Sequence, residues 1–456
     1  MKRALLVLIM VLMVFSVFAS GDKEQKKVVT TTAAGETVYP AGKAVIYGYG
    51  NPQYLQQYYD AWLERNRDIA PGVTIEIVQT EGAAASREKV TMTYLAGAYG
   101  DLPDAMYIDP VNLMDLAAGG IIKNETEFVN KLASQMVDGA INDGLYKGQA
   151  YGLPESVRPQ VLFFNKAVFD TYGVDPALMA TMKGYIEAGR QLKEKSKGKV
   201  YLSYIDPGSR TWRYWGRRGL MPQANAKIWD NDGNVVIGSD PGTKLALTTL
   251  DTLYKEGLLL KSAIMQPALY DAMRDGNVAT FYIGAFWDEF IRKNVSETSG
   301  DWRVMPAPVF EEVGKAGAPV ASYFAIVDKT NGVYAGLMEK LWKDFQFDNA
   351  PRKEWVNAMV EQNAPYANPI SLEMLQDAFW KEPSSFYGGQ SFREMEGKGL
   401  QNASDNLIVT PQDAEADTII SVELEKYVAG DLTIQQAIAN MDKNLKSRIG
   451  KAKIIK

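Results

Sequence analysis

The stretch Tyr146–Pro176 reads YKGQAYGLPESVRPQVLFFNKAVFDTYGVDP in a chain of 456 residues. Gly148, Gly152 and Pro154 punctuate its first half, and the apolar run Val161–Phe164 follows. Gly and Pro interrupt regular elements, whereas a short apolar run predicts a buried strand. Two interpretations are open: a strand that leaves one sheet and enters another, or an ordinary turn between two elements of one domain.

On both sides of this stretch, apolar runs alternate with segments whose large side chains recur at helical spacing. Such alternation predicts an α/β fold with parallel sheets built from βαβ units. The expected strands are 44–49, 73–78, 104–108, 161–164, 278–283, 303–305 and 321–327. The expected helices are 53–68, 86–98, 182–195, 243–256, 336–345, 352–361, 372–379, 418–428 and 434–449.

The composition excludes several kinds of chemistry. Cys and His are both 0, which removes Cys nucleophiles, Ser-His-Asp triads, disulfides and the usual zinc sites. We therefore expect no metal and no cofactor. The net charge of −6 gives no basic footprint for nucleic acid, so no such partner is expected. Aromatic residues make up 11%, which supports a stacking-type ligand site only weakly, because most of them pack in cores.

The N-terminus has the pattern of an export signal. Lys2 and Arg3 precede the apolar stretch Ala4–Phe18, and small residues follow. This pattern predicts a signal peptide over residues 1–20, with an uncleaved anchor helix as the alternative. The polar residues 21–40 predict a flexible tether. Because of the export signal, we expect a protein that is periplasmic or associated with the cell envelope. We do not expect lipid attachment on Cys, since the chain has none.

The opening stretch resembles a pattern of family 1 extracellular solute-binding proteins, the carbohydrate-binding components of ABC importers. That pattern is K-G-x-x-Y-G-L-P, then an aromatic-Asn-Lys and G-x-D-P. Later stretches are similar to the family in the same order: LYKEGL (253–258), DAMRDGNVATFYIGAFW (271–287) and DWRVMPAPVF (301–310). Thr280 stands where Met is usual. The resemblance covers roughly residues 40–456.

The resemblance implies a two-lobe periplasmic-binding-protein-like (type II) fold, similar to maltose-binding protein, with discontinuous lobes joined by hinge crossovers. The expected parts are lobe one (41–152 plus 311–367), lobe two (162–303 plus 368–456) and crossovers (153–161 and 304–310). It also implies a monomeric receptor, not an enzyme. The lobes would close on a carbohydrate, expected to be an oligosaccharide, and present it to the membrane permease.

The alternative function is a secreted glycoside hydrolase or polysaccharide lyase that depends on carboxylates. Such an enzyme needs two carboxyl groups roughly 5–10 Å apart in its cleft. Asp and Glu are plentiful, but no spacing in the sequence singles out a pair.

Candidate ligand contacts in lobe one follow the expected strands. Tyr49 and Asn51 lie in the loop after the first strand, where an Asn amide can both donate to and accept from a hydroxyl. Asp109 follows the third strand, and Tyr323 lies on a later one. The alternative for Asn51 and for Asp109 is that each only caps the following helix.

Other candidates lie at the crossover and in lobe two. Glu155 and Arg158 stand in the crossover, with an ion pair between them as the alternative for Arg158. The family stacks a sugar on an aromatic side chain where this chain has Trp287; the alternative is a core Trp, with Phe286 in the pocket. The run SRTWRYWGRR (209–218) supplies Trp212 and Arg213 as a cleft wall or a cation–π patch, and its arginines leave room for an acidic sugar such as a uronide.

Overall fold

The computed structural model describes residues 29–31, 35–50, 52–137, 139–330, 332–362, 364, 366–401, 403–404 and 409–454. The expected signal peptide lies outside these residues, as does Asn51. Part of the expected tether is described and is folded: β1 (Thr30–Thr31) pairs antiparallel with β2 (Thr37–Val38). Tyr39 is buried in the first lobe and its backbone N–H donates to Ile69 O at 2.7 Å. The folded body therefore begins before residue 41.

Lobe one is built on a five-stranded sheet with the order β4-β3-β5-β14-β8. Strand β3 runs parallel to its neighbours β4 and β5, whereas β14 runs antiparallel to β5 and β8. The strands are β3 (Gly42–Gly48), β4 (Val73–Gln79), β5 (Ala105–Ile108), β8 (Leu153–Arg158) and β14 (Val320–Ile326), with a small β6 (Leu145–Tyr146) and β7 (Gln149–Ala150) hairpin. The α-helices are α2 (Gln53–Arg65), α3 (Ala83–Leu95), α4 (Pro110–Ala118), α5 (Thr126–Leu132), α12 (Ala335–Phe347) and α13 (Asn349–Glu361). The 3₁₀ turns are η1 (Tyr99–Asp101), η2 (Ala133–Gln135), η3 (Asn142–Gly144), η7 (Met374–Gln376) and η8 (Ala378–Lys381).

Lobe two has β9 at the centre of a three-stranded sheet, antiparallel to both of its neighbours. Its strands are β9 (Gln160–Asn165), β12 (Thr280–Gly284) and β13 (Trp302–Pro306), beside a parallel pair of β10 (Ser203–Ile205) and β11 (Leu259–Lys261). The helices are α6 (Lys166–Tyr172), α7 (Met182–Lys195), α8 (Met221–Gln223), α9 (Pro241–Lys255), α10 (Pro267–Arg274), α11 (Trp287–Asn294), α14 (Phe392–Gln401), α15 (Asp413–Ala429) and α16 (Ile434–Arg448). A π-helix, η5 (Thr211–Leu220), and the 3₁₀ turns η4 (Pro176–Ala180) and η6 (Ser296–Thr298) complete it.

Local sequence explains these elements. In α7 the buried residues Met182, Tyr185 and Leu192 recur at helical spacing, and the Thr181 side chain accepts from Gly184 N–H at the first turn. All six residues of β9 are buried, because the strand is paired on both edges and covered on both faces. This burial explains its continuous apolar run.

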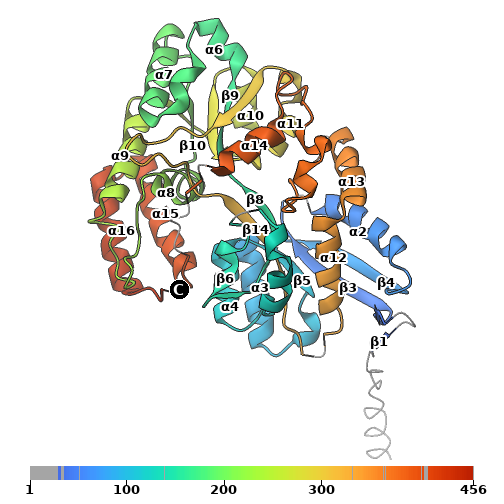
Figure 1. Cartoon of the computed structure of the whole chain (residues 1–456). Coiled ribbons are helices and arrows are strands. Elements are labelled where there is room, and N and C mark those ends of the chain that lie inside the picture. The colour runs from blue at the N-terminus through green and yellow to red at the C-terminus, as the bar shows by residue number, and fades with distance from the viewer. Residues whose placement is uncertain are drawn as a thin grey trace, which may run out of the picture.

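The chain passes between the two lobes more than once, and β8 leads to the first of these crossings (Figure 1). It enters lobe two at Pro159, which separates β8 of one sheet from β9 of the other. It returns to lobe one between β13 and β14, and it passes to lobe two again between Trp380 and Phe386, which lie in different hydrophobic cores. The opening stretch thus contains a strand that changes sheets, the first of its two interpretations.

Several expectations about local structure were wrong. The three-stranded sheet of lobe two is antiparallel, because β12 and β13, which are connected through α11, both run opposite to β9 between them. Residues 372–379 form short 3₁₀ turns instead of a helix, because Asp377 is held by Lys353 and Asn349 of α13. Ile370 and Trp380 pack in the core of lobe one, beyond the boundary expected at residue 367. Ala316 packs in the core of lobe two, although lobe one was expected to resume at 311.

Among the described residues, no helix is both long and apolar enough to cross a bilayer.

Candidate functional site

Asp109 connects the two lobes. It follows β5 and caps α4, where its Oδ1 accepts from Asn112 N–H at 3.0 Å and from Asn112 Nδ2 at 2.8 Å. Its Oδ2 lies 3.3 Å from Arg213 Nη2, which belongs to η5 of lobe two. Burial alone would raise the pKa of Asp109, but Arg213, Arg218 and the Asn112 hydrogen bonds together hold it below its usual value. Asp109 thus caps α4, as one of its two interpretations predicted, and also pairs with Arg213 of the other lobe.

Tyr49 follows β3, the strand next to β5, and is half-buried beside Asp109. Burial and the Asp109 carboxylate raise the pKa of Tyr49 to about 12, although Arg213 and a hydrogen bond with Ser322 oppose them. Tyr49 therefore stays a neutral phenol that can donate to and accept from a hydroxyl group.

The π-helix η5 divides its side chains between the core of lobe two and the junction of the lobes. Trp212 is 1% exposed and its Nε1 donates to Asp417 Oδ1 at 2.7 Å. Gly216 allows this packing, since a Cβ there would lie 2.3 Å from the Trp212 ring. Arg213 and Tyr214 point the other way and remain accessible. Arg213 thus reaches lobe one, whereas Trp212, expected in the cleft, is a core residue.

Two further predicted contacts are also core residues in this structure. Trp287 is fully buried and stacks between Tyr270, at 6.2 Å, and Phe290, at 5.3 Å between ring centroids. Tyr323 is fully buried on β14 and its hydroxyl donates to Ala140 O at 3.0 Å. Neither ring offers a free face, so the alternative of a core Trp is the one observed at Trp287.

The accessible aromatic side chains near Trp287 form what we call the aromatic band, defined as Tyr214, Phe286 and Phe290. All three are half-buried, with ring centroids 5.7 Å apart for Tyr214 and Phe286 and 6.1 Å for Phe286 and Phe290. Contacts with lobe one flank the band on both sides. Arg213, next to Tyr214, pairs with Asp109, and Lys293 of α11 lies 5.9 Å from the Tyr54 ring centroid. The band therefore faces lobe one.

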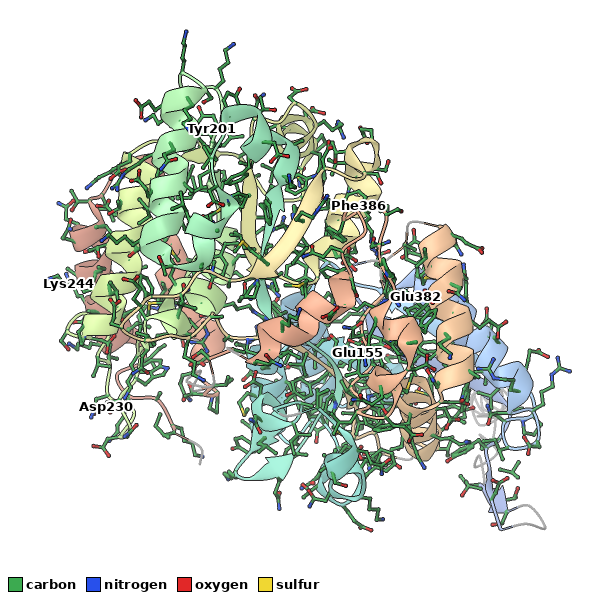
Figure 2. The ribbon with its side chains drawn as sticks, turned by 45° about the horizontal axis from the view of Figure 1, so that its top comes forward. Glu155, Tyr201, Asp230, Lys244, Glu382 and Phe386 are labelled. Atoms are coloured by element: carbon green, nitrogen blue, oxygen red, sulfur yellow. The ribbon has the colours of Figure 1, made fainter. Side chains whose placement is uncertain are left out.

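Glu155 lies where the two lobes meet (Figure 2). Its backbone O accepts from Gln346 Nε2 at 2.9 Å, and its carboxylate makes no ion pair with any described residue. That carboxylate acts electrostatically on Glu289 of α11 in the other lobe. Burial raises the pKa of Glu289 to about 7, Arg158 and Arg292 oppose this rise, and Asp288 and Glu155 add to it.

Arg158 is buried at the end of β8 and does not pair with Glu155. It donates to Tyr366 O, and its Nε lies 3.9 Å from Glu396 Oε1 of α14. Burial raises the pKa of Glu396 to about 7, against the opposing effect of Arg158. Arg158 therefore contributes to the contact between the lobes in this structure, with its guanidinium already occupied.

The structure thus brings Tyr49, Asp109, Arg213 and Glu155 to the junction of the lobes, and leaves Trp212, Trp287 and Tyr323 in cores. Sequence reasoning missed Tyr54, Asp143, Glu289 and Phe290, and named Phe286 only as an alternative. Phe290 follows Phe286 by one helical turn, a spacing that could have indicated a shared face. Asp143 gives no such signal.

The described residues contain no group of three or more acidic side chains suited to a metal ion. They line a cavity of about 350 Å³ in lobe two, between α7, α9 and residues 310–312. No residue of lobe one contributes to this cavity, so it is separate from the junction.

Comparison with known protein families shows to which family this two-lobed protein belongs. The model of the bacterial extracellular solute-binding proteins matches residues 27–331. The chain belongs to this family. Members of the solute-binding family are extracellular binding proteins, which agrees with the resemblance seen in the sequence.

Two curated relatives are arabinooligosaccharide-binding proteins. The protein of Halalkalibacterium halodurans is 25% identical over an alignment of 258 residues, which covers 52% of this chain and 56% of the relative. The protein of Bacillus subtilis is 22% identical over 308 residues, 62% of this chain and 67% of the relative. The match to this solute-binding chain thus spans little more than half the length of the first relative.

Solved structures share the fold over nearly the whole chain. A binding protein associated with an ABC transporter of B. animalis subsp. lactis, in complex with β-1,6-galactobiose, has a TM-score of 0.73 at 19% identity, covering 89% of this chain and 97% of the other. An ABC substrate-binding protein of Listeria monocytogenes, in complex with cycloalternan, has a TM-score of 0.69 at 20% identity, covering 90% and 100%. These similarities confirm the type II two-lobe fold of the solute-binding family.

Proposed function

We propose that this protein is the extracytoplasmic receptor of an ABC importer and binds an oligosaccharide between its lobes. The observation that carries the proposal is the junction itself. In a member of a solute-binding family, the aromatic band of lobe two lies between two contacts with lobe one, Arg213 with Asp109 and Lys293 with Tyr54. Polar side chains of lobe one, among them Tyr49 and Glu155, lie at the same junction. Aromatic rings cover the apolar faces of sugars, and phenol, carboxylate and guanidinium groups bind their hydroxyls.

The two lobes give such a receptor its mechanism. A ligand that contacts both lobes gains its full set of contacts only when they are closed, so it shifts the population toward the closed form. The closed form is the one that the permease would recognise. The relatives named for arabinooligosaccharides and the neighbours crystallised with galactobiose and cycloalternan support an oligosaccharide as the ligand.

The same proposal covers location and assembly. We infer export through a signal peptide at residues 1–20 and action outside the membrane as a monomer. Lipid attachment on Cys is not available to this sequence, because its Cys count is 0. The permease subunits would be its membrane partner.

Binding calorimetry tests the proposal with arabinotriose, β-1,6-galactobiose and maltotriose, followed by chromatography of the recovered sugars. We expect micromolar or tighter binding of at least one sugar, which is recovered intact. Glu155 and Glu289 make the second measurement necessary, since they are carboxyl groups that interact across the junction. Cleaved sugar would reject the receptor in favour of a hydrolase, and the absence of binding to any oligosaccharide would reject the ligand class.

A further inference from the structure

Arg218 of η5 is a buried cation without a partner. Arg218 is only 7% exposed, and its Nη1 is buried without a hydrogen bond. Within the described part of the chain, Arg218 forms no ion pair. Buried charged groups in proteins are nearly always paired or hydrogen-bonded. The Nη1 atom of Arg218 therefore lacks an acceptor, which a group from outside the chain could supply.

The position of Arg218 relates it to lobe one. The segment η5 contacts α15, α15 contacts α4 of lobe one, and α4 contacts η3, which holds Asp143. Arg213, from the same π-helix, is bonded to Asp109 at the start of α4. Arg218 in turn interacts electrostatically with Asp109 and with Asp143. Arg218 thus lies at the junction, opposite residues of lobe one.

Asp143 is the matching acceptor on the other lobe. It is half-buried, and its carboxylate has no hydrogen bond or ion pair to any described residue. Burial raises the pKa of Asp143 to about 6, against the opposing effects of Arg218 and Arg217.

The other acids nearby are already engaged. Asp109 accepts from Asn112 and Arg213, and Asp417 accepts from Trp212. Asp413 accepts from Trp229 and Thr410 and pairs with Arg217. Among the described residues, Asp143 is therefore a carboxylate of lobe one that acts on Arg218 and is not engaged elsewhere.

We propose that Arg218 and Asp143 together bind hydroxyl groups of the ligand and select neutral saccharides over acidic ones. A hydroxyl accepts from the guanidinium and donates to the carboxylate, so neighbouring hydroxyls of one sugar satisfy both groups. A uronate also satisfies Arg218, but Asp143, Asp109 and Asp417 would repel its charge. The sequence left room for an acidic sugar; the carboxylates around Arg218 argue against it. This inference rests on the proposed function.

The test is calorimetry on the full chain with neutral probes (arabinotriose, β-1,6-galactobiose, maltotriose) and acidic probes (digalacturonate, cellobiouronate). We expect the acidic probes to bind at least about 100-fold more weakly than the best neutral one. Arg218→Gln should weaken that neutral sugar by about 100-fold and Asp143→Asn by about 10-fold, because each leaves a hydroxyl with a poorer partner. Asp143→Asn should also reduce the ratio of the affinity for the neutral sugar to the affinity for the acidic probes by about 10-fold, since it removes a repulsive charge.

Matched controls are Arg274→Gln and Asp232→Asn, which remove surface charges of lobe two and should leave affinity unchanged. Thermal unfolding of each variant verifies that it folds. If Arg218→Gln does not fold, Asp143→Asn still decides the test. Equal or tighter binding of an acidic probe overturns this inference. So does a neutral sugar whose affinity survives both substitutions. No binding of any probe rejects the proposed function instead.

Discussion

The interior of lobe two and its face toward lobe one hold similar aromatic side chains in adjacent positions. Trp287 is sealed between Tyr270 and Phe290, whereas Phe286, one residue earlier, is half-exposed and faces lobe one. Within η5 the same division separates buried Trp212 from accessible Tyr214. Neighbours in sequence therefore serve different ends: the interior residues determine stability, and the junction residues are available to a ligand.

Removing the buried ring of Trp287 should have the strongest effect on stability. Trp287→Ala should lower the free energy of unfolding by about 3–5 kcal/mol, because it leaves a large cavity beneath Phe290. Denaturant titration followed by circular dichroism measures the change. If Trp287→Ala kept full stability and lost only sugar affinity, Trp287 would be a ligand contact after all.

Buried carboxyl groups at the junction should influence the stability of the fold, as interior residues do. The pKa of Glu396 is about 7 in the folded chain and about 4.5 as an ordinary Glu, so the folded state binds more protons between these values. Stability should therefore fall as pH rises from about 5 to 8, by on the order of 2 kcal/mol for this group. Unfolding titrations at several pH values measure the slope.

Glu396→Gln provides the control for this slope. It removes the titrating carboxyl while keeping a similar shape, so the stability of the variant should depend less on pH over the same range. A slope identical to that of the unaltered chain would exclude Glu396 as its source.

The aromatic band should affect ligand binding more than stability. Phe286→Ala should reduce affinity for the best oligosaccharide by about 10–100-fold, because a half-buried ring that would cover the sugar is lost. Its free energy of unfolding should change by about 1 kcal/mol or less. Calorimetry and denaturant titration on the same preparation separate these effects, with Phe379→Ala of lobe one as a control for losing a half-buried ring. Unchanged affinity would remove the band from the binding site.

The smallest expected effect concerns the contact between Asp109 and Arg213. Arg213 is half-exposed, so the pair contributes about 1 kcal/mol or less and is screened by salt. Arg213→Gln should shift unliganded chains toward a larger radius of gyration in small-angle X-ray scattering, most clearly at low ionic strength. The effect should disappear at about 1 M salt, where charges are screened within a few ångström. An unchanged radius at low salt would mean that this contact does not hold the lobes together.

Sequence patterns were most informative where burial is one-sided or complete. The apolar run in β9 and the spacing of Met182, Tyr185 and Leu192 in α7 predicted these elements nearly to their ends. Asp109 was predicted at the end of its strand because the α/β alternation itself places it there.

The site was less predictable because residue type does not determine which way a side chain points. Trp287 and Phe286 are equally apolar, and their roles depend on how Tyr270 and Phe290 pack around them. The helix expected over 372–379 failed for a similar reason, since contacts with α13 override its local spacing. The partners that decide these cases are distant in sequence.

Pro159 has a consequence for how the lobes can turn. The pairing of β8 ends at Arg158 and that of β9 begins at Gln160, and the carbonyl of Pro159 between them accepts from Ala285 N–H of lobe two at 2.8 Å. Proline carries no N–H, so Pro159 cannot donate a backbone hydrogen bond that would join the two sheets into one. Because its ring also fixes φ, torsion between the lobes along this strand must pass through the ψ angle of Pro159 and the dihedrals of its neighbours. At this crossing, the proline therefore leaves few dihedral angles through which the lobes can turn.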